Sequence, residues 1–161
     1  METQMHWIAP GEDFSPCRRI RIAVFCDEQG YRVEDEFDAE DAAAHHLLLT
    51  LDGEPVATGR ILPVSEGVWR LGRIAVSRVL RGTGLGRVLV EEMRQKAQSL
   101  GAARFLLDAQ CRVVGFYEKC GFVVTGEEHM DGHVPHVGME WRGEPAERFA
   151  NIAARKEGVR L

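Results

Sequence analysis

Residues 81–87 read RGTGLGR, so three glycines alternate between two arginines. Glycine has no side chain, and the backbone around it can approach a ligand closely. If a helix follows, its first N–H groups have no partners inside the helix and can bind an anion. This pattern predicts a site for a phosphate or pyrophosphate, with the candidate binding residues Arg81, Gly82, Thr83, Gly84, Leu85, Gly86 and Arg87.

Two common phosphate-binding loops do not fit this spacing. A dinucleotide-binding loop reads G-x-G-x-x-G, but the sixth position counted from Gly82 is Arg87. A P-loop reads G-x-x-x-x-G-K-[ST], and this segment has no lysine at the required position. What the segment does match is R-x-x-G-x-G.

The elements that position this loop can be read from the apolar pattern around it. An apolar run that ends in Ile74, Ala75 and Val76 predicts a short buried strand. Residues 85–100 place apolar side chains on one face at helical spacing, and Gly101 follows them as a stop. We therefore expect a strand, a glycine loop and a helix in this order.

A second motif follows the predicted helix. Residues 104–110, RFLLDAQ, predict a strand, and residues 113–122, VVGFYEKCGF, predict a short helix that ends at Gly121. Together with R-x-x-G-x-G, this arrangement resembles the GNAT superfamily of acyl-CoA-dependent N-acetyltransferases. The resemblance covers residues 45–141, with both motifs in the expected order.

The resemblance implies roles for several of these residues. The glycine loop would hold the pyrophosphate of acetyl-CoA, the co-substrate, and Tyr117 would lie beside the CoA sulfur as a proton donor. The strand ending in Ile74, Ala75 and Val76 would pair its backbone with the pantetheine arm. It also implies an α/β fold with a mixed, twisted central sheet, splayed in the middle and covered by helices on both faces.

Shorter patterns are similar to the ElaA-like branch of this superfamily. They are V-F-x-x-E-Q at residues 24–29, G-R-I-A-V before the loop, D-A-Q at residues 108–110, and the late D-G-H-V-P-H. Gln110 stands where the wider superfamily carries asparagine, as in that branch, and is a candidate cofactor-binding residue.

Acetyl transfer to an amine requires a base, because an amine with a pKa of about 10.4 is mostly protonated at neutral pH. Many GNAT enzymes place a glutamate on the central strand, but Leu71, Gly72 and Arg73 supply none. Two candidates remain: Glu28, which fits the E-Q of the ElaA-like pattern, and His136, which alternates with apolar residues on the last predicted strand. Each also has a structural interpretation, as a surface carboxylate or a satisfied strand histidine.

Other chemistry is less well supported by the sequence. His129, His133 and His136 have the spacing H-x-x-x-H-x-x-H, but a strand does not bring such residues together by itself, and we predict no metal. None of the four cysteines has a recognisable His–Asp companion pattern, so we expect direct transfer in a ternary complex. They lack C-x-x-C spacing and indicate reduced thiols in a cytoplasmic protein.

An acidic stretch at residues 27–41 carries eight Asp and Glu residues and one arginine, Arg32. It is either a solvated surface or an acidic rim that attracts a cationic amine, and the sequence leaves both open. The whole chain has 20 Lys and Arg against 25 Asp and Glu, a formal net charge of −5, which argues against nucleic acid as a partner. Neither a membrane-spanning run nor a signal peptide is predicted.

The remaining pattern predicts one domain over residues 1–161. Strands are expected at 5–9, 46–51, 55–62, 122–127 and 134–141, a helix at 14–24, and turns at Asp52-Gly53 and at residues 130–132. The tail, 142–161, is expected to be helical at 146–156 and to pack on the sheet or on a second subunit, which makes a homodimer a candidate assembly.

Two functions remain open at this point. One is an N-acetyltransferase that acts on a small-molecule or peptide amine with acetyl-CoA as the donor. The other is a non-catalytic acyl-CoA-binding module with a regulatory or interaction role. Tyr117 favours the enzyme, because a binding module has no need of a proton donor at the sulfur.

Overall fold

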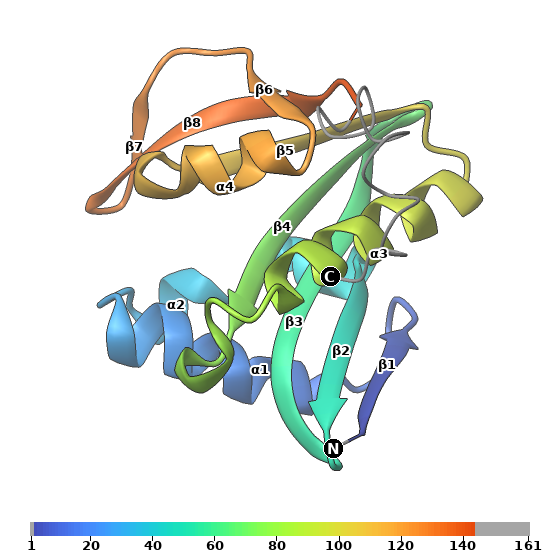
Figure 1. Cartoon of the computed structure of the whole chain (residues 1–161), viewed down its shortest axis with the longest axis vertical. Helices are drawn as coiled ribbons and strands as arrows, with labels where there is room; N and C mark the ends of the chain where they lie inside the picture. The colour runs from blue at the N-terminus through green and yellow to red at the C-terminus, as the bar shows by residue number, and fades with distance from the viewer. Residues whose placement is uncertain (1, 144–161) are drawn as a thin grey trace, which may run out of the picture.

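The computed structural model describes residues 2–143, which form a mixed, open eight-stranded sheet in the order β1-β2-β3-β4-β5-β8-β6, with β7 paired to β8 (Figure 1). Only β4 and β5 run parallel; the other pairs are antiparallel. The strands are β1 Thr3–Ile8, β2 His45–Leu51, β3 Glu54–Ser65, β4 Val68–Val76, β5 Arg104–Gln110, β6 Phe122–Val124, β7 His129–Asp131 and β8 Val134–Trp141.

Helices cover both faces of this sheet, as predicted. In Figure 1, α3 and α4 lie in front of the strands, and α1 lies behind them. The helices are α1 Ser15–Arg21, the π-helix η1 Ile22–Glu28, α2 Val33–Glu36, α3 Leu85–Ser99 and α4 Val114–Lys119, with 3₁₀ turns η2 Ala39–Ala43, η3 Arg78–Leu80 and η4 Cys111–Val113.

Two apolar clusters hold these layers together. The larger one lies between α3 and the sheet and includes Leu89, Met93 and Leu71, all fully buried. The smaller one lies under α1 and the π-helix and includes Ile20 and Phe25. Burial of apolar side chains on one face of each helix is the main force that fixes the helices to the sheet.

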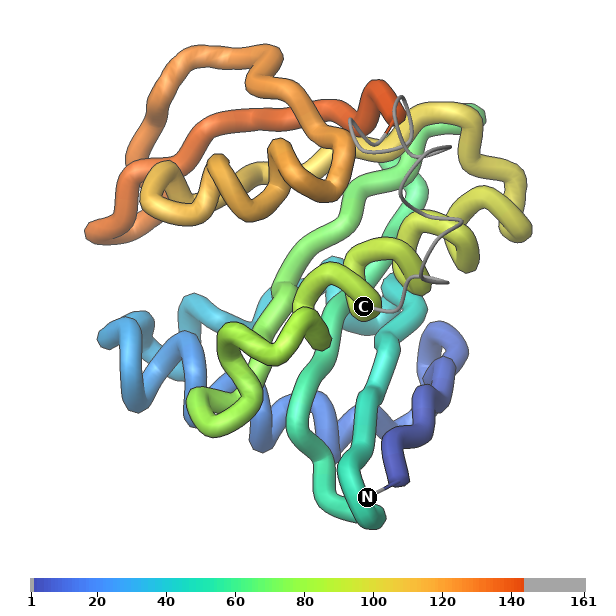
Figure 2. The backbone as a smooth tube through the Cα atoms, viewed as in Figure 1, coloured from blue at the N-terminus to red at the C-terminus, as the bar shows by residue number. Residues whose placement is uncertain are grey.

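The sheet splays in the middle because β4 and β5 pair over only part of their length. Val68–Leu71 of β4 pair with Arg104–Leu107 of β5, and beyond that point the two strands separate. Figure 2 shows the chain diverging there into two arms, one with β4 and the other with β5 and β8. Arg73 sits at the separation with φ of +48°, an uncommon backbone conformation for a residue other than glycine.

Local predictions were confirmed where the sequence carries strong turn residues. Asp52 and Gly53, with φ of 50° and 86°, join β2 to β3 as a tight hairpin. Pro16 lies in the first turn of α1. After α3, Gly101 adopts φ of 108° and ends the helix.

Several expected boundaries were wrong. The helix expected at residues 14–24 continues as a π-helix to Glu28, and β4 begins at Val68, earlier than its apolar run. Strand β6, expected to reach residue 127, ends at Val124. Of residues 130–132, which were expected in a turn, Met130 and Asp131 belong to β7, and the turn lies at residues 132–133. The helix expected at residues 146–156 lies outside the described residues. Within the described part of the chain, no helix has the length and apolar character needed to cross a membrane.

Candidate active site

One continuous cavity of about 1620 Å³ runs between the two arms of the sheet. At one end it is lined by the glycine loop that precedes α3, and at the other by the acidic segment 33–41 and by β7 and β8. Residues 74–76 of β4 line it between these ends, on the strand that has left β5. The splay of the sheet therefore creates the space in which a ligand can lie along β4.

The glycine loop has the backbone that the sequence predicted. Gly82 and Gly84 adopt φ of 82° and 90°, which side chains other than glycine rarely tolerate, and Gly84 is the residue before α3 begins. A Cβ atom added at Gly86 would lie 3.2 Å from the Phe116 ring, so this glycine lets α4 approach α3. Gly84, Gly86 and Arg87, at the start of α3, line the cavity, and the first N–H groups of a helix have no acceptor within the helix.

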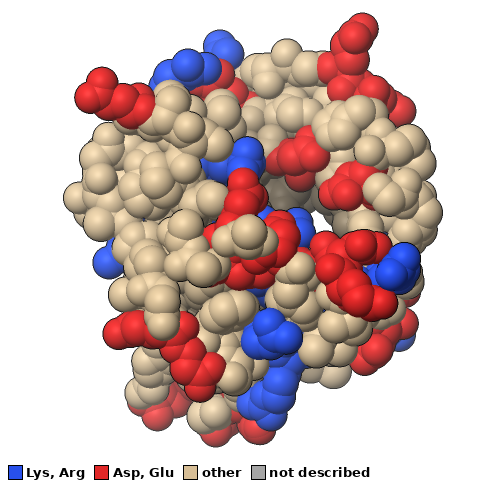
Figure 3. All heavy atoms as spheres, turned by 180° about the vertical axis from the view of Figure 1, so that it is seen from behind, with Lys and Arg blue, Asp and Glu red and all other residues tan. Residues whose placement is uncertain are grey.

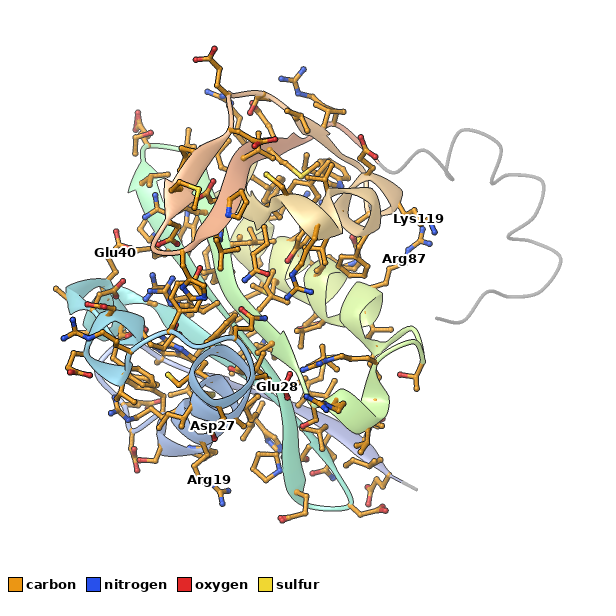
Figure 4. The ribbon with its side chains drawn as sticks, turned by 90° about the vertical axis from the view of Figure 1, so that its left-hand side faces the viewer. Arg19, Asp27, Glu28, Glu40, Arg87 and Lys119 are labelled. Carbon is orange, nitrogen blue, oxygen red and sulfur yellow. The ribbon has the colours of Figure 1, made fainter. Side chains whose placement is uncertain are left out.

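Most of the predicted loop residues line the cavity. Among them are Arg81, Gly82, Gly84, Gly86 and Arg87, together with Ile74, Ala75 and Val76 of β4. Thr83 and Leu85 do not line it: the Thr83 hydroxyl bonds the Leu80 carbonyl, and Leu85 packs against the larger core. Lys119, at the end of α4, is a further cation in the lining, at the same edge of the molecule as Arg87 (Figure 4).

Glu28 lies at the glycine-loop end of the cavity. Its carboxylate accepts a hydrogen bond of 2.6 Å from the Arg81 guanidinium, which also donates to the Val76 carbonyl at 3.0 Å. In Figure 4, Glu28 points inward from the π-helix, whereas Asp27 and Arg19 point outward. The structure therefore places Glu28 as the partner of a loop arginine.

His136 is buried, with 6% exposure, and lines the opposite side of the cavity on β8. Its Nδ1 lies 2.9 Å from the Val134 carbonyl, which can only accept, so Nδ1 carries the hydrogen. The other ring nitrogen, Nε2, is then a free proton acceptor. It lies 3.8 Å from the Asp131 carboxylate, beyond hydrogen-bond length but close enough to stabilise a positive charge on the ring.

The other two histidines of the β7–β8 hairpin, His129 and His133, form hydrogen bonds to other residues. His129 donates to the Asp108 carboxylate at 3.0 Å, and this hydrogen bond raises the pKa of the His129 ring. His133 donates from Nε2 to the Gln29 carbonyl at 2.7 Å. Within residues 2–143 no group of three or more His, Cys, Asp and Glu side chains is arranged to hold a metal ion.

Tyr117 lies on α4 and lines the same cavity. Its ring packs edge-on against Phe116, with centroids 5.0 Å apart, and against Phe122 at 6.2 Å. Burial raises the pKa of the Tyr117 phenol, so the hydroxyl stays protonated at neutral pH. This side chain can therefore donate a proton but does not act as a base.

Gln110 also lines the cavity, at the end of β5. Its side-chain amide donates to the Gln29 side chain at 2.8 Å, across the space between the two arms, and accepts from Arg112 at 3.1 Å. Sequence reasoning predicted this residue in the cavity, but not its contact with the opposite wall.

The acidic stretch is not a free acidic rim, because arginines from other elements neutralise much of it. Arg21 of α1 is fully buried and donates to Glu36 at 2.8 Å and to Asp41 at 2.7 Å. Arg60 of β3 donates to Asp41 at 2.8 Å and to Asp38 at 2.8 Å. These ion pairs anchor segment 33–41 to α1 and the sheet.

Two arginines of β4 form further ion pairs in this network. Arg73 contacts the Glu36 carboxylate at 3.0 Å and Asp38 at 3.2 Å, and Arg70 contacts Glu40 at 2.9 Å. The acidic stretch therefore has arginine partners besides Arg32, the one arginine within it. Its partners stand on α1, β3 and β4, and nothing in their sequence spacing indicates the pairing.

Comparisons with known proteins agree with this geometry. A family model described as an acetyltransferase (GNAT) domain matches residues 16–142. The uncharacterized N-acetyltransferase YjcF of Bacillus subtilis (strain 168) is 35% identical over 122 residues, which is 74% of this chain and 86% of that protein.

Two solved structures with related sequences share the fold. Escherichia coli ElaA superposes with a TM-score of 0.78 at 27% identity, over 88% of this chain and all of the other. An acyl-CoA N-acyltransferase from Pseudomonas aeruginosa gives 0.77 at 29% identity, with the same shares of the two chains. The match therefore extends over the arms, the cavity and the elements around them.

Proposed function

We propose that this chain, which belongs to the GNAT acetyltransferase family, transfers an acetyl group from acetyl-CoA to a primary amine by direct transfer in a ternary complex. One observation carries the proposal: a single cavity joins an anion-binding glycine loop to a protonated tyrosine and a histidine with a free ring nitrogen. Binding and chemistry then share one space, as transfer between two bound substrates requires.

The loop end suits the phosphates of acetyl-CoA. Gly82 and Gly84 adopt positive φ in the loop before α3, and the first N–H groups of a helix, which have no acceptor within it, favour an anion. Arg81, Arg87 and Lys119 bring positive charge to the same part of the lining. The edge of β4 at Ile74, Ala75 and Val76 has left β5 and offers its backbone to an extended ligand.

His136 is the residue we assign as the general base. Its Nε2 accepts the proton that the amine loses as the new C–N bond forms, and Asp131 stabilises the resulting imidazolium. Glu28 is the weaker candidate, because its carboxylate bonds Arg81 at the loop end. The hydrogen-bonded pair of His129 and Asp108, with the His129 ring 6.3 Å from that of His136, offers a route by which the proton can reach solvent.

Tyr117 is the residue we assign as the general acid. Cleavage of the C–S bond leaves negative charge on sulfur, and a hydroxyl that stays protonated can donate its proton there. Such assistance typically contributes ~10²–10⁴ in rate. An acceptor that binds as the ammonium ion loses one proton to solvent before it attacks; the imidazole takes a second proton as the amide forms, and the phenol gives one to the sulfur. The overall conversion of ammonium ion and acetyl-CoA to amide and CoA thiol therefore releases one proton.

The acceptor in this proposal is a cationic amine. The support for it is the set of carboxylates that stay exposed in the cavity, because arginines neutralise much of the acidic stretch. Asp35 and Asp131 remain well exposed where they line the cavity. Seen from behind, Asp and Glu side chains gather around a hollow in the surface (Figure 3). Carboxylates at such an opening raise the local concentration of a cation.

The proposal is tested by mixing the protein with acetyl-CoA and a panel of primary amines, and by measuring release of the CoA thiol. We expect release that depends on the amine and an acetylated amine in equal amount. If the protein binds acetyl-CoA but no amine increases thiol release, the chain is the alternative, a non-catalytic acyl-CoA-binding module.

A further inference from the structure

The carboxylate that faces the proposed base comes from the end of a short, exposed strand. Asp131 is the last residue of β7, whose three residues are all exposed, and it stands opposite Val134 of β8 just before the turn. Its carboxylate lies 3.8 Å from Nε2 of His136. A strand of this length that buries none of its side chains is held weakly by its own pairing. A contact from outside the hairpin can therefore decide where Asp131 lies.

Tyr31, which follows the π-helix on the other arm, makes such a contact. Its hydroxyl donates to the Asp131 carbonyl at 3.0 Å. Burial and the charge of Asp131 raise the pKa of Tyr31 to about 12, so the hydroxyl stays protonated and remains a donor. A Cβ atom added at Gly132 would lie 3.1 Å from the Tyr31 ring. The ring thus lies directly against the turn that follows Asp131.

The Tyr31 ring is itself supported by its own arm. It packs against the smaller apolar cluster, which includes Ile20 and Phe25. A tyrosine has only two rotatable side-chain bonds up to its rigid ring, so packing of the ring also restricts the hydroxyl. The aspartate side chain is short, and a fixed backbone at Asp131 restricts its carboxylate to the few positions that two torsions allow. The support therefore extends from the cluster under α1 to the carboxylate beside His136.

We infer that Tyr31 is a positioning residue for acetyl transfer, because it holds the Asp131 carboxylate beside the ring nitrogen of His136. This inference rests on the proposed function, in which that nitrogen takes a proton as the amide forms. A negative charge nearby stabilises the imidazolium, and the Coulomb energy falls as the distance between the charges grows. The Asp108 carboxylate, on β5, is bonded to His129, whereas that of Asp131 faces Nε2.

A double-mutant cycle on kcat tests the inference, with acetyl-CoA and the best amine both saturating. Asp131→Asn removes the charge but keeps the backbone carbonyl that Tyr31 contacts, and should lower kcat by about 5-fold or more. Tyr31→Phe keeps the ring and should lower kcat by at least about 3-fold in the parent. In the Asp131→Asn protein the same change should lower kcat by less than about 1.5-fold, because residues that act through one another are not additive.

His133→Ala is the matched control, because it removes the other hydrogen bond between residues 29–31 and residues 131–133. That bond runs from the exposed His133 to the Gln29 carbonyl at 2.7 Å and does not involve the Asp131 carbonyl. The side chains of Gln29 and Gln110 continue to join the two arms in every variant of the cycle. We expect the control to keep kcat within about 2-fold of the parent value.

Three results would overturn the inference. They are an equal effect of Tyr31→Phe on kcat with and without the Asp131 charge, a loss in His133→Ala as large as that in Tyr31→Phe, and a change confined to the KM for the amine. The last result would make Tyr31 a substrate contact. If the parent binds acetyl-CoA but acetylates no amine in the panel, the proposed function itself is wrong and this inference falls with it.

Discussion

The glycine loop at one end of the cavity is shaped by backbone angles, whereas the acidic segment at the other end is held by buried charges. Gly82 and Gly84 need only their own positive φ to form the loop. Segment 33–41 instead depends on Arg21 and Arg60, which reach it from α1 and β3. The conformation of the glycine loop therefore depends on its own residues. The position of segment 33–41 depends on ion pairs with distant residues, and loss of one partner should disturb it.

Substitution of each candidate base by glutamine should affect different kinetic constants. His136→Gln should lower kcat by about 10²-fold or more, because it removes the free Nε2 that accepts the proton. Glu28→Gln is the matched change at the loop end and should leave kcat near the parent value. It should lower the KM for acetyl-CoA by up to about 5-fold, since its carboxylate no longer competes for Arg81.

Steady-state rates with the best amine decide between these assignments. A fall in kcat of about 100-fold in Glu28→Gln, with little change in His136→Gln, would identify Glu28 as the general base and contradict the assignment of His136.

Breaking the ionic network should cost the most stability. Arg21→Ala leaves Glu36 and Asp41 buried without one of their partners, which typically costs about 3–5 kcal/mol of unfolding free energy. Arg32→Ala, whose pairs with Glu34 and Asp35 are exposed, should cost about 0.5 kcal/mol or less. Urea denaturation of both variants measures the difference, and equal losses would show that the buried pairs do not anchor the segment.

The same network should make the protein sensitive to acid. Burial opposes ionisation of Asp41, but hydrogen bonds and charge from Arg21 and Arg60 outweigh it and lower the pKa to about 2, from 3.8. Because the folded-state pKa is depressed, this stabilisation is present above pH ~4 and is lost as the pH falls toward ~2, about 2 kcal/mol in all.

Asp41→Asn provides the measurement. The difference in unfolding free energy between parent and variant should shrink as the pH is lowered from 5 toward 2. A difference that stays constant over this range would mean that Asp41 does not titrate as the ion pairs require.

At the loop end a smaller, local effect is expected. Gly84→Val forces a branched side chain into φ of 90° beside the phosphate site and should weaken CoA binding by about 10-fold, or 1.4 kcal/mol. Gly53→Val imposes the same strain at φ of 86° in the β2–β3 turn, where nothing lies within 4 Å of the new Cβ. Calorimetry with CoA should show the parent affinity for Gly53→Val; equal weakening in both variants would mean that strain, not the loop, controls binding.

The contrast between the ends also explains what the sequence could predict. The strand, loop and helix at residues 74–100 and the motif around Tyr117 are contiguous, so their residue order alone indicated the fold and the family. The predicted resemblance to GNAT and ElaA-like proteins is confirmed by the family match and by the superposition on ElaA. The assigned roles of individual residues stay predictions.

At the end of the cavity that we propose for the acceptor, the structure depends on pairs of residues far apart in the sequence. Arg60 and Asp41 belong to different elements, and Tyr31 meets Asp131 a hundred residues later, so no local pattern reports either contact. The acidic run was visible, but its partners were not. His136 could be selected because strand alternation is local, whereas its free Nε2 depends on the carbonyl of Val134 in the folded hairpin.

The most direct test of the account is the rate of acetyl transfer by Tyr117→Phe, measured together with its affinity for acetyl-CoA. The substitution keeps the ring between Phe116 and Phe122 and removes only the proton donor. We predict that kcat falls by about 10²-fold or more while the Kd for acetyl-CoA stays within about 2-fold, as expected for an interaction made in the transition state. A Phe variant that turns over its best amine at the parent rate would contradict the account, and Tyr117 would then be a packing residue.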